Sequence, residues 1–216
     1  MSRLILAVDT TNESGSLALL RDCEVVEEMP LHAPKGFAQV LYGHLAELLE
    51  HHGLKPGDID CFAAATGPGS FTGVRVGLAC VKGLAEAVGR PAVGISNLRA
   101  IASFGTAALR AAVLDAHRGE VYGAVYDAAS RVVTPEVVAP FDRWLEMLPE
   151  GELEFVAWGL APSLAGTRFA GAAVRMAPSE LAGAIGRLAF REEARDPAAL
   201  DANYVRRSDA ELLWKE

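Results

Sequence analysis

The stretch that decides the fold is Thr66–Ala85, which reads Thr-Gly-Pro-Gly-Ser-Phe-Thr-Gly-Val-Arg-Val-Gly-Leu-Ala-Cys-Val-Lys-Gly-Leu-Ala. The apolar run Cys61–Ala65 precedes it and predicts a buried strand that leads through a glycine-proline-glycine turn into a helix. That helix contains Gly73, Gly77 and Gly83, and each internal glycine costs about 1 kcal/mol relative to alanine. We therefore expect its backbone to approach a ligand, another part of the chain or another protein closely.

Two of these glycines, Gly73 and Gly77, lie one turn apart on one face of the predicted helix. Small residues on one face let two helices pack closely, which favours an interface between chains. Close packing against the chain's own sheet is the alternative. A second helix predicted over Gly36–His52 could contribute to the interface. The expected partner surface comprises the glycines and the side chains around them: Phe71, Gly73, Val74, Gly77, Cys80, Val81 and Leu84.

Two loops have the composition of a phosphate site. Asp9-Thr10-Thr11 follows an apolar strand, and turns of this kind form backbone nests for anions; an Asx turn is the alternative. The Gly67–Ser70 loop leads to a helix N-terminus, which attracts anions. A tight turn with Ser70 or Thr72 as the helix cap is the alternative. The possible nucleotide or phosphate loop therefore comprises Asp9, Thr10, Thr11, Gly67, Gly69 and Ser70.

Composition excludes several classes of protein. The 216 residues are 51% hydrophobic and have a formal net charge of −8, which argues against independent nucleic-acid binding. The N-terminal apolar run is too short for a signal peptide and no segment is long enough to span a membrane, so we expect a cytoplasmic protein. The three scattered cysteines, Cys23, Cys61 and Cys80, indicate reduced structural thiols.

The order of predicted strands suggests a duplication. Each half opens with a three-stranded meander, formed by Leu4–Val8, Ser16–Leu20 and Glu24–Glu28 in the first half and by Ala111–Leu114, Val121–Tyr126 and Arg131–Val138 in the second. Further elements are expected at Pro91–Ile95, Asn97–Ala108, Phe141–Leu148, Phe155–Trp158 and Ser179–Arg191, the last capped by Ser179. The pattern predicts an α/β protein of two similar subdomains, residues 1–105 and a smaller one at 106–216.

Catalytic motifs are scarce. The sequence has no His-Glu-x-x-His motif, no paired-cysteine metal site and no Gly-x-Ser-x-Gly elbow. One polar cluster, Asp115, Glu120 and Tyr122, lies among apolar strands. It could form a site loop, and a hairpin with outward-facing charges is equally consistent. We therefore predict no catalytic residues and no metal ligands.

Six stretches, in order along nearly the whole chain, resemble the TsaB (YeaZ) family: Leu6–Thr11, Gly67–Arg75, Lys82–Ala85, Gly94–Ser96, Asp115–Tyr122 and Tyr204–Ser208. The glycine-rich block is the most specific of them. The resemblance implies an actin-like, sugar-kinase-like ATPase (ribonuclease H-like) fold. It also implies a role in forming N6-threonylcarbamoyladenosine at position 37 of tRNAs that read codons beginning with A.

In that family the resemblance implies a non-catalytic scaffold that binds the catalytic subunit TsaD and acts with the ATPase TsaE. Transfer RNA would be engaged indirectly through the complex. The chain itself would need no cofactor, while ATP and a divalent metal would serve the partner subunits. We expect a homodimer in isolation, because a helix face built for a related partner can pair with its own copy. A nucleotide-binding ATPase or kinase of the same fold is the alternative function.

The sequence departs from the patterns of related proteins at four positions. TsaD-like subunits have a metal-binding His-x-x-x-His after the strand that matches Pro91–Ile95, where this chain has Asn97 and Ile101. Neither side chain offers an imidazole nitrogen. The metal-dependent glycoprotease activity once assigned to this family therefore has no metal ligands to support it in this chain. Phe37 replaces a common histidine, and His117 replaces a common arginine.

Overall fold

The computed structural model describes residues 2–34 and 36–206. They form two compact units, one from residues 1–100 and 178–202 and the other from 101–177 and 203–216, within those described ranges. The family stretch Tyr204–Ser208 therefore lies partly outside the described residues, from Arg207 onward. The sequence-based division at residue 105 differs from this one, because residues 178–202 return to the first unit.

The first unit is built on a five-stranded sheet in the order β3-β2-β1-β4-β5. Strands β1, β2 and β3 form the predicted antiparallel meander, and β4 and β5 add parallel strands beside β1. The predicted strand at Cys61–Ala65 is confirmed without change. The bounds are β1 Leu4–Asp9, β2 Ser14–Arg21, β3 Glu24–His32, β4 Cys61–Ala65 and β5 Ala92–Ile95.

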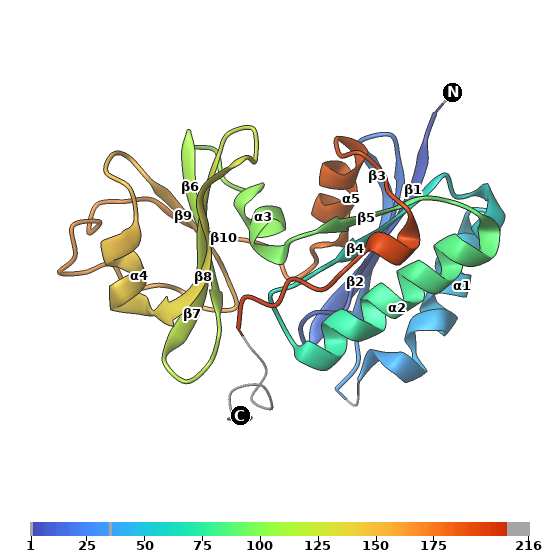
Figure 1. Cartoon of the computed structure of the whole chain (residues 1–216), viewed down its shortest axis with the longest axis horizontal. Helices are drawn as coiled ribbons and strands as arrows, with labels where there is room; N and C mark the ends of the chain where they lie inside the picture. Colours follow the sequence, from blue (N-terminus) through green and yellow to red (C-terminus); the bar gives the residue numbers. More distant parts are fainter. Residues whose placement is uncertain (1, 35, 207–216) are drawn as a thin grey trace. The chain divides into compact units, whose positions relative to one another are not determined.

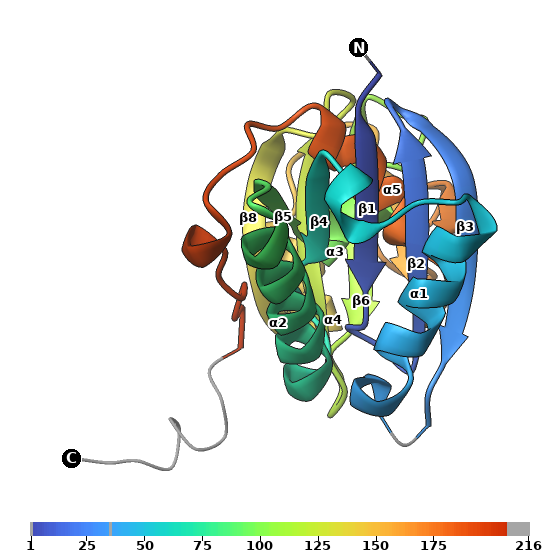
Figure 2. The ribbon, with the colours of Figure 1, turned by 90° about the vertical axis from the view of Figure 1, so that its right-hand side faces the viewer.

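Helices cover both faces of this sheet. Helices α1 (Leu41–His51) and α2 (Phe71–Val88) lie on one face and α5 (Ala182–Phe190) lies on the other, as Figures 1 and 2 show. Leucines of α1 and apolar residues of α2 pack with β1 and β4 in one buried cluster. The short helix α3 spans Asn97–Ala102, and three 3-10 turns are η1 Phe37–Gln39, η2 Pro56–Asp58 and η3 Pro197–Ala199.

The start of α5 corrects the predicted cap. Ser179 bonds Glu180, and the helix begins only at Ala182. Its first amides are satisfied instead by the first meander. The Ala182 amide donates to Ser16 Oγ at 2.9 Å and the Gly183 amide donates to Glu28 Oε1 at 2.8 Å. This capping from distant strands explains why the segment belongs to the first unit.

The second unit repeats the topology. Its five-stranded sheet has the order β10-β9-β6-β7-β8, in which an antiparallel meander (β6, β7, β8) is extended by parallel strands β9 and β10. The predicted duplication and the α/β fold are thus confirmed. The bounds are β6 Leu109–Asp115, β7 Glu120–Asp127, β8 Val132–Pro140, α4 Phe141–Met147, β9 Glu154–Trp158 and β10 Val174–Met176.

Two secondary-structure elements differ from the sequence expectation. The short edge strand β10 was not predicted, because it has only three residues and all three are exposed. Helix α3 ends at Ala102, six residues earlier than expected. In the core, Trp144 of α4 lies against Gly123, where a Cβ would be 2.2 Å from the indole ring. Trp144 also packs edge-on to Phe155.

Candidate functional site

The turn after β1 holds a buried carboxylate. Asp9 Oδ1 accepts hydrogen bonds from the Thr11 amide at 2.9 Å and the Thr11 hydroxyl at 2.7 Å, which is the Asx turn that the sequence left open. Its other oxygen, Oδ2, is buried and accepts no bond from the described residues. Burial raises the pKa of Asp9 above its usual value, against the lowering effect of the Thr11 bonds.

The Gly67–Ser70 loop and the Asp9 turn are brought together. The Ser70 amide donates to the Thr11 carbonyl at 2.6 Å, and a Cβ on Gly69 would lie 2.5 Å from that oxygen. Ser70 Oγ accepts the Gly73 amide at 3.3 Å, so Ser70 is the helix cap. The space beside Gly69 is therefore occupied by this chain's own backbone, which supports the tight-turn reading. Nucleotide binding by these six residues stays a prediction.

Asn97 connects both loops, a role that sequence reasoning missed. Its side-chain oxygen accepts the Gly67 amide at 3.0 Å, and its Nδ2 donates to Thr11 Oγ1 at 2.6 Å. The side chain is fully buried, as is Ile101 one turn later. Thus the Asn97 side chain is a structural amide that holds the two loops together. A buried asparagine after a strand was the only signal in the sequence. The described residues contain no group of three or more metal-ligating side chains.

The glycine face of α2 packs against its own sheet, which corrects the predicted clearance for a partner helix. A Cβ on Gly73 would lie 2.0 Å from the Thr10 carbonyl oxygen, and one on Gly77 would lie 2.6 Å from Thr10 Oγ1. The helix must approach this closely because Thr10 Oγ1 also donates to the Gly73 carbonyl at 2.7 Å. Of the seven predicted surface residues, five are buried: Gly73, Val74, Gly77, Cys80 and Val81.

The opposite face of α2 is exposed and carries the third glycine. A Cβ on Gly83 would meet no heavy atom of another described element within 4 Å, and one on Gly43 of α1 would point into open space in the same way. Phe71 of the predicted set is 43% exposed and Leu84 is half-buried, while Tyr42 on α1 is 58% exposed. We call eight of the exposed residues on these two helices the open face: Tyr42, Gly43, Ala46, Phe71, Thr72, Arg75, Ala79 and Gly83; the exposed Glu47, Glu50, His51, Glu86 and Ala87 lie on the same helices outside this set.

Contacts between side chains order the open face. The Arg75 guanidinium lies 3.6 Å from the centre of the Phe71 ring. Tyr42 contacts Cys80, which joins α1 to α2. Burial raises the pKa of Cys80 to about 11, and the nearby thiolate charge, followed by burial, raises the pKa of Tyr42. Both groups are therefore neutral near pH 7, and the contact adds no charge to the surface.

The second polar cluster, at the β6–β7 connection, is a hairpin. The Ala116 amide donates to the Glu120 carbonyl at 3.0 Å, and Nδ1 of the exposed His117 lies 3.4 Å from Asp115 Oδ2. Arg206 from the chain's end donates to the Ala116 carbonyl and pairs with Glu120. The Arg206 guanidinium also lies 5.6 Å from the Tyr122 ring centre. The charges around this turn therefore hold the end of the described chain in place.

Phe37 has a packing role. It is buried in the first core, and a Cβ on Gly15 would lie 2.9 Å from its ring. The aromatic ring at position 37 therefore makes apolar contacts with β2. No helix among the described residues has the length and apolarity needed to cross a membrane.

Comparison with known proteins identifies close relatives. The TsaB tRNA threonylcarbamoyladenosine biosynthesis protein of Bacillus subtilis is 33% identical, over 98% of this chain and 98% of the relative. The TsaB protein of Escherichia coli is also 33% identical, over 74% of each chain. A family model described as TsaD, tRNA N6-adenosine threonylcarbamoyltransferase, matches residues 28–182.

Solved structures agree with the fold. YeaZ from Pseudomonas aeruginosa superposes with a TM-score of 0.80 at 26% identity, over 94% of this chain and 99% of that one. Component A of the (R)-2-hydroxyglutaryl-CoA dehydratase from Acidaminococcus fermentans superposes with a TM-score of 0.54 at 11% identity, over 88% of this chain and 98% of that one. The second likeness concerns the fold alone.

Proposed function

The chain belongs to the TsaB family of tRNA threonylcarbamoyladenosine biosynthesis proteins, and from this premise we propose that it is a non-catalytic scaffold of the complex that makes this nucleoside. Its partner is a TsaD-type transferase subunit, and a TsaE-type ATPase and the tRNA join through the complex. It acts in the cytoplasm. The proposed contact is the open face on α1 and α2.

The observation that carries this proposal is the pair of open glycines. Contacts with Thr10 account for Gly73 and Gly77, whereas a Cβ on Gly43 or Gly83 would meet no heavy atom of another described element within 4 Å. Each costs about 1 kcal/mol of helix stability relative to alanine, with no compensating contact within the described residues. A partner helix that approaches these two positions accounts for both. The exposed rings of Tyr42 and Phe71 on the same two helices supply the aromatic anchors that interfaces favour.

The non-catalytic role rests on what the polar residues do. Asn97 and Thr11 bond each other and neighbouring loops, and Asp9 is buried beneath them. Glu120 is engaged by Arg206. Each of these side chains makes at least one structural bond, and the one unbonded oxygen, Asp9 Oδ2, is buried. This leaves little free chemistry for a transfer reaction. The chain's contribution to the modification is accordingly the binding and positioning of the catalytic subunit.

The test substitutes Gly83 in the full chain co-expressed with its TsaD-type partner. Gly83→Arg should fold normally, because its side chain points into open space, and should abolish co-purification and tRNA modification. The matched control is Gly57→Arg, which changes another exposed and open glycine outside α1 and α2; folding of each variant is verified by circular dichroism. If Gly83→Arg retains full association and modification, the proposed contact is wrong.

The alternative of a nucleotide-dependent kinase or ATPase has a direct test as well. The spaces beside Gly69 and Gly73 are filled by Thr11 and Thr10, which argues against a phosphate between these loops. Calorimetric titration of the isolated chain with MgATP should therefore give no micromolar binding and no turnover. Micromolar binding accompanied by hydrolysis would favour the ATPase over the scaffold.

A further inference from the structure

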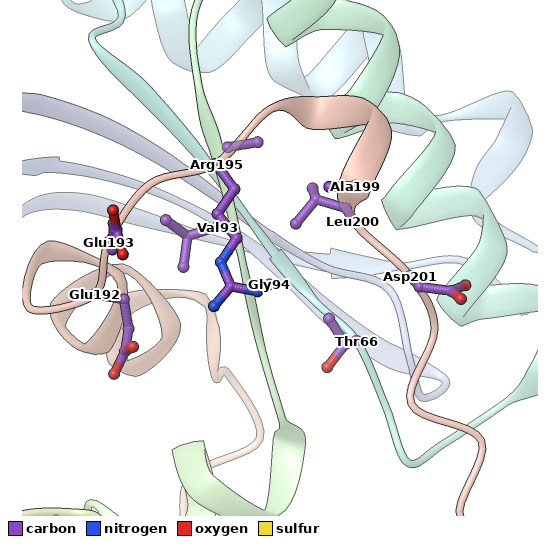
Figure 3. A pocket seen from close by; sticks show the side chains of 10 residues that line it. Thr66, Val93, Gly94, Glu192, Glu193, Arg195, Ala199, Leu200 and Asp201 are labelled. Carbon is purple, nitrogen blue, oxygen red and sulfur yellow. The ribbon is translucent and has the colours of Figure 1, made fainter.

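The first unit has a pocket of about 240 Å³ at the outer edge of β5, and Figure 3 shows the side chains that line it. Its walls come from the end of β4, from β5, and from the chain after α5. The residues that matter below are Thr66, Gly94, Glu193, Arg195, Leu200 and Asp201.

The floor of this pocket is a piece of unpaired strand edge. The Pro91 and Ile95 carbonyls accept hydrogen bonds from the amides of Phe62 and Thr66, so the backbone N–H and C=O groups of the odd-numbered β5 residues point toward β4. Ala92 faces outward and pairs with Arg195 through two bonds of 2.9 Å. By the same alternation, the N–H and C=O of Gly94 face outward. Across the described ranges no residue bonds either group.

The segment after α5 does not pair with the Gly94 backbone. The pairing with β5 is a single antiparallel bridge, so Glu193 is the residue that would extend it to Gly94, and these two residues form no backbone hydrogen bond among the described residues. Lys82 of α2 then holds the returning segment by donating to the Ala198 and Leu200 carbonyls, at 3.2 and 2.9 Å. A Cβ on Gly94 would lie 2.6 Å from Thr66 Cγ2 and 3.4 Å from Leu200 Cδ2. Glycine therefore leaves room between these two side chains.

Charges of both signs surround the open edge. In Figure 3 the Arg195 side chain extends toward the level of Gly94, and both residues line the pocket. The Arg195 guanidinium makes no ion pair within the described residues. Glu193 likewise has no described partner, and Asp201 accepts only the adjacent Ala202 amide at 2.8 Å. Glu192, by contrast, is already paired with Arg99 at 2.6 Å.

We propose that this pocket binds a free α-amino acid. The carboxylate accepts from the Gly94 amide and the Arg195 guanidinium, and the ammonium group donates to the Gly94 carbonyl beside the carboxylates of Glu193 and Asp201. A longer peptide does not fit this edge, because Ala92 is already paired and β5 ends at Ile95. The backbone N–H and C=O of Gly94 are thus the only donor and acceptor that this stretch of β5 presents to a ligand. This site does not depend on the proposed partner binding.

The test is a titration of the isotope-labelled full-length chain, followed by amide NMR. Each of the twenty common L-amino acids is added singly at millimolar concentration. At least one should shift the Gly94 amide resonance in a saturable manner. The amine that lacks the carboxylate of the best ligand should shift it far less. No saturable Gly94 shift with any amino acid, or an equal shift with the amine, would refute the proposal.

A charge variant checks the role of the guanidinium. Arg195→Gln should weaken the binding by about tenfold, the loss of one charge-assisted hydrogen bond. Because Arg195 is exposed and pairs with Ala92 only through its backbone, the variant should keep the resonances of the rest of the unit. The matched control, Arg191→Gln, changes an exposed arginine outside the pocket lining. Equal affinity of both variants and the parent chain would contradict the proposed contact.

Discussion

Thr10 and Gly73 are in direct contact at the point where β1 ends and α2 begins. Thr10 Oγ1 donates to the Gly73 carbonyl at 2.7 Å, and a Cβ on Gly73 would lie 2.0 Å from the Thr10 carbonyl oxygen. This contact explains two internal glycines of α2 without any partner. It also leaves Gly83, on the opposite face, as the glycine that the chain itself does not explain.

The first prediction separates these two kinds of glycine. Gly73→Ala should lower the free energy of unfolding by about 2–3 kcal/mol, because the new methyl group overpacks against backbone that cannot rotate away. Gly83→Ala should raise it by about 0.5–1 kcal/mol, because alanine favours the helix and meets open space. Urea denaturation of both variants measures the difference. A Gly73→Ala protein as stable as the parent would contradict the contact with Thr10.

The second prediction concerns the buried Asp9. Its folded-state pKa is raised above the unfolded value, so between those two pKa values the folded chain binds the proton more tightly and stability falls as pH rises. The loss is at most about 1.4 kcal/mol per pH unit. Asp9→Asn removes this titration, so the stability of the parent relative to the variant should decrease from about pH 4 upward. Urea denaturation across pH gives both curves, and parallel curves would show that Asp9 does not titrate as described.

The third prediction tests the cap of α5. Ser16→Ala should cost about 1–3 kcal/mol, because the buried Ala182 amide loses its acceptor. Ser179→Ala, at the exposed residue that the sequence pattern nominates as the cap, should change stability by less than about 0.5 kcal/mol. Thermal or urea denaturation distinguishes them. A larger loss for Ser179→Ala than for Ser16→Ala would reverse the assignment.

The fourth prediction concerns self-association. We expect the isolated chain to form a homodimer through the open face, since one face can pair with its own copy about a two-fold axis. Gly83→Arg should make it monomeric, and adding the TsaD-type partner should dissociate the parent homodimer. Size-exclusion chromatography with light scattering reports the mass. A parent chain that remains monomeric across micromolar concentrations would exclude this homodimer.

Much of the fold follows from local sequence patterns. The apolar run Cys61–Ala65, the Ser70 cap and the Gly89 stop determine β4 and α2 with no reference to the rest of the chain, because strand burial and helix ends depend on near neighbours. The two meanders were predictable for the same reason. The edge strand β10 was not, because an exposed three-residue strand is defined only by its pairing with β9.

The contacts within the candidate site could not be predicted from the sequence. The spacing of Gly73 and Gly77 indicates only that another part of the structure approaches the helix closely. A partner helix and the chain's own sheet are equally compatible with that spacing. Only the tertiary structure identifies Thr10 as the close neighbour of these glycines. Thr10 and Gly73 are 63 positions apart, and the distance between them depends on how α2 packs on the sheet. The same holds for Asn97 joining two loops and for Ser16 capping α5. Local propensity determines which elements form, whereas long-range packing determines which of their faces remain free for a partner.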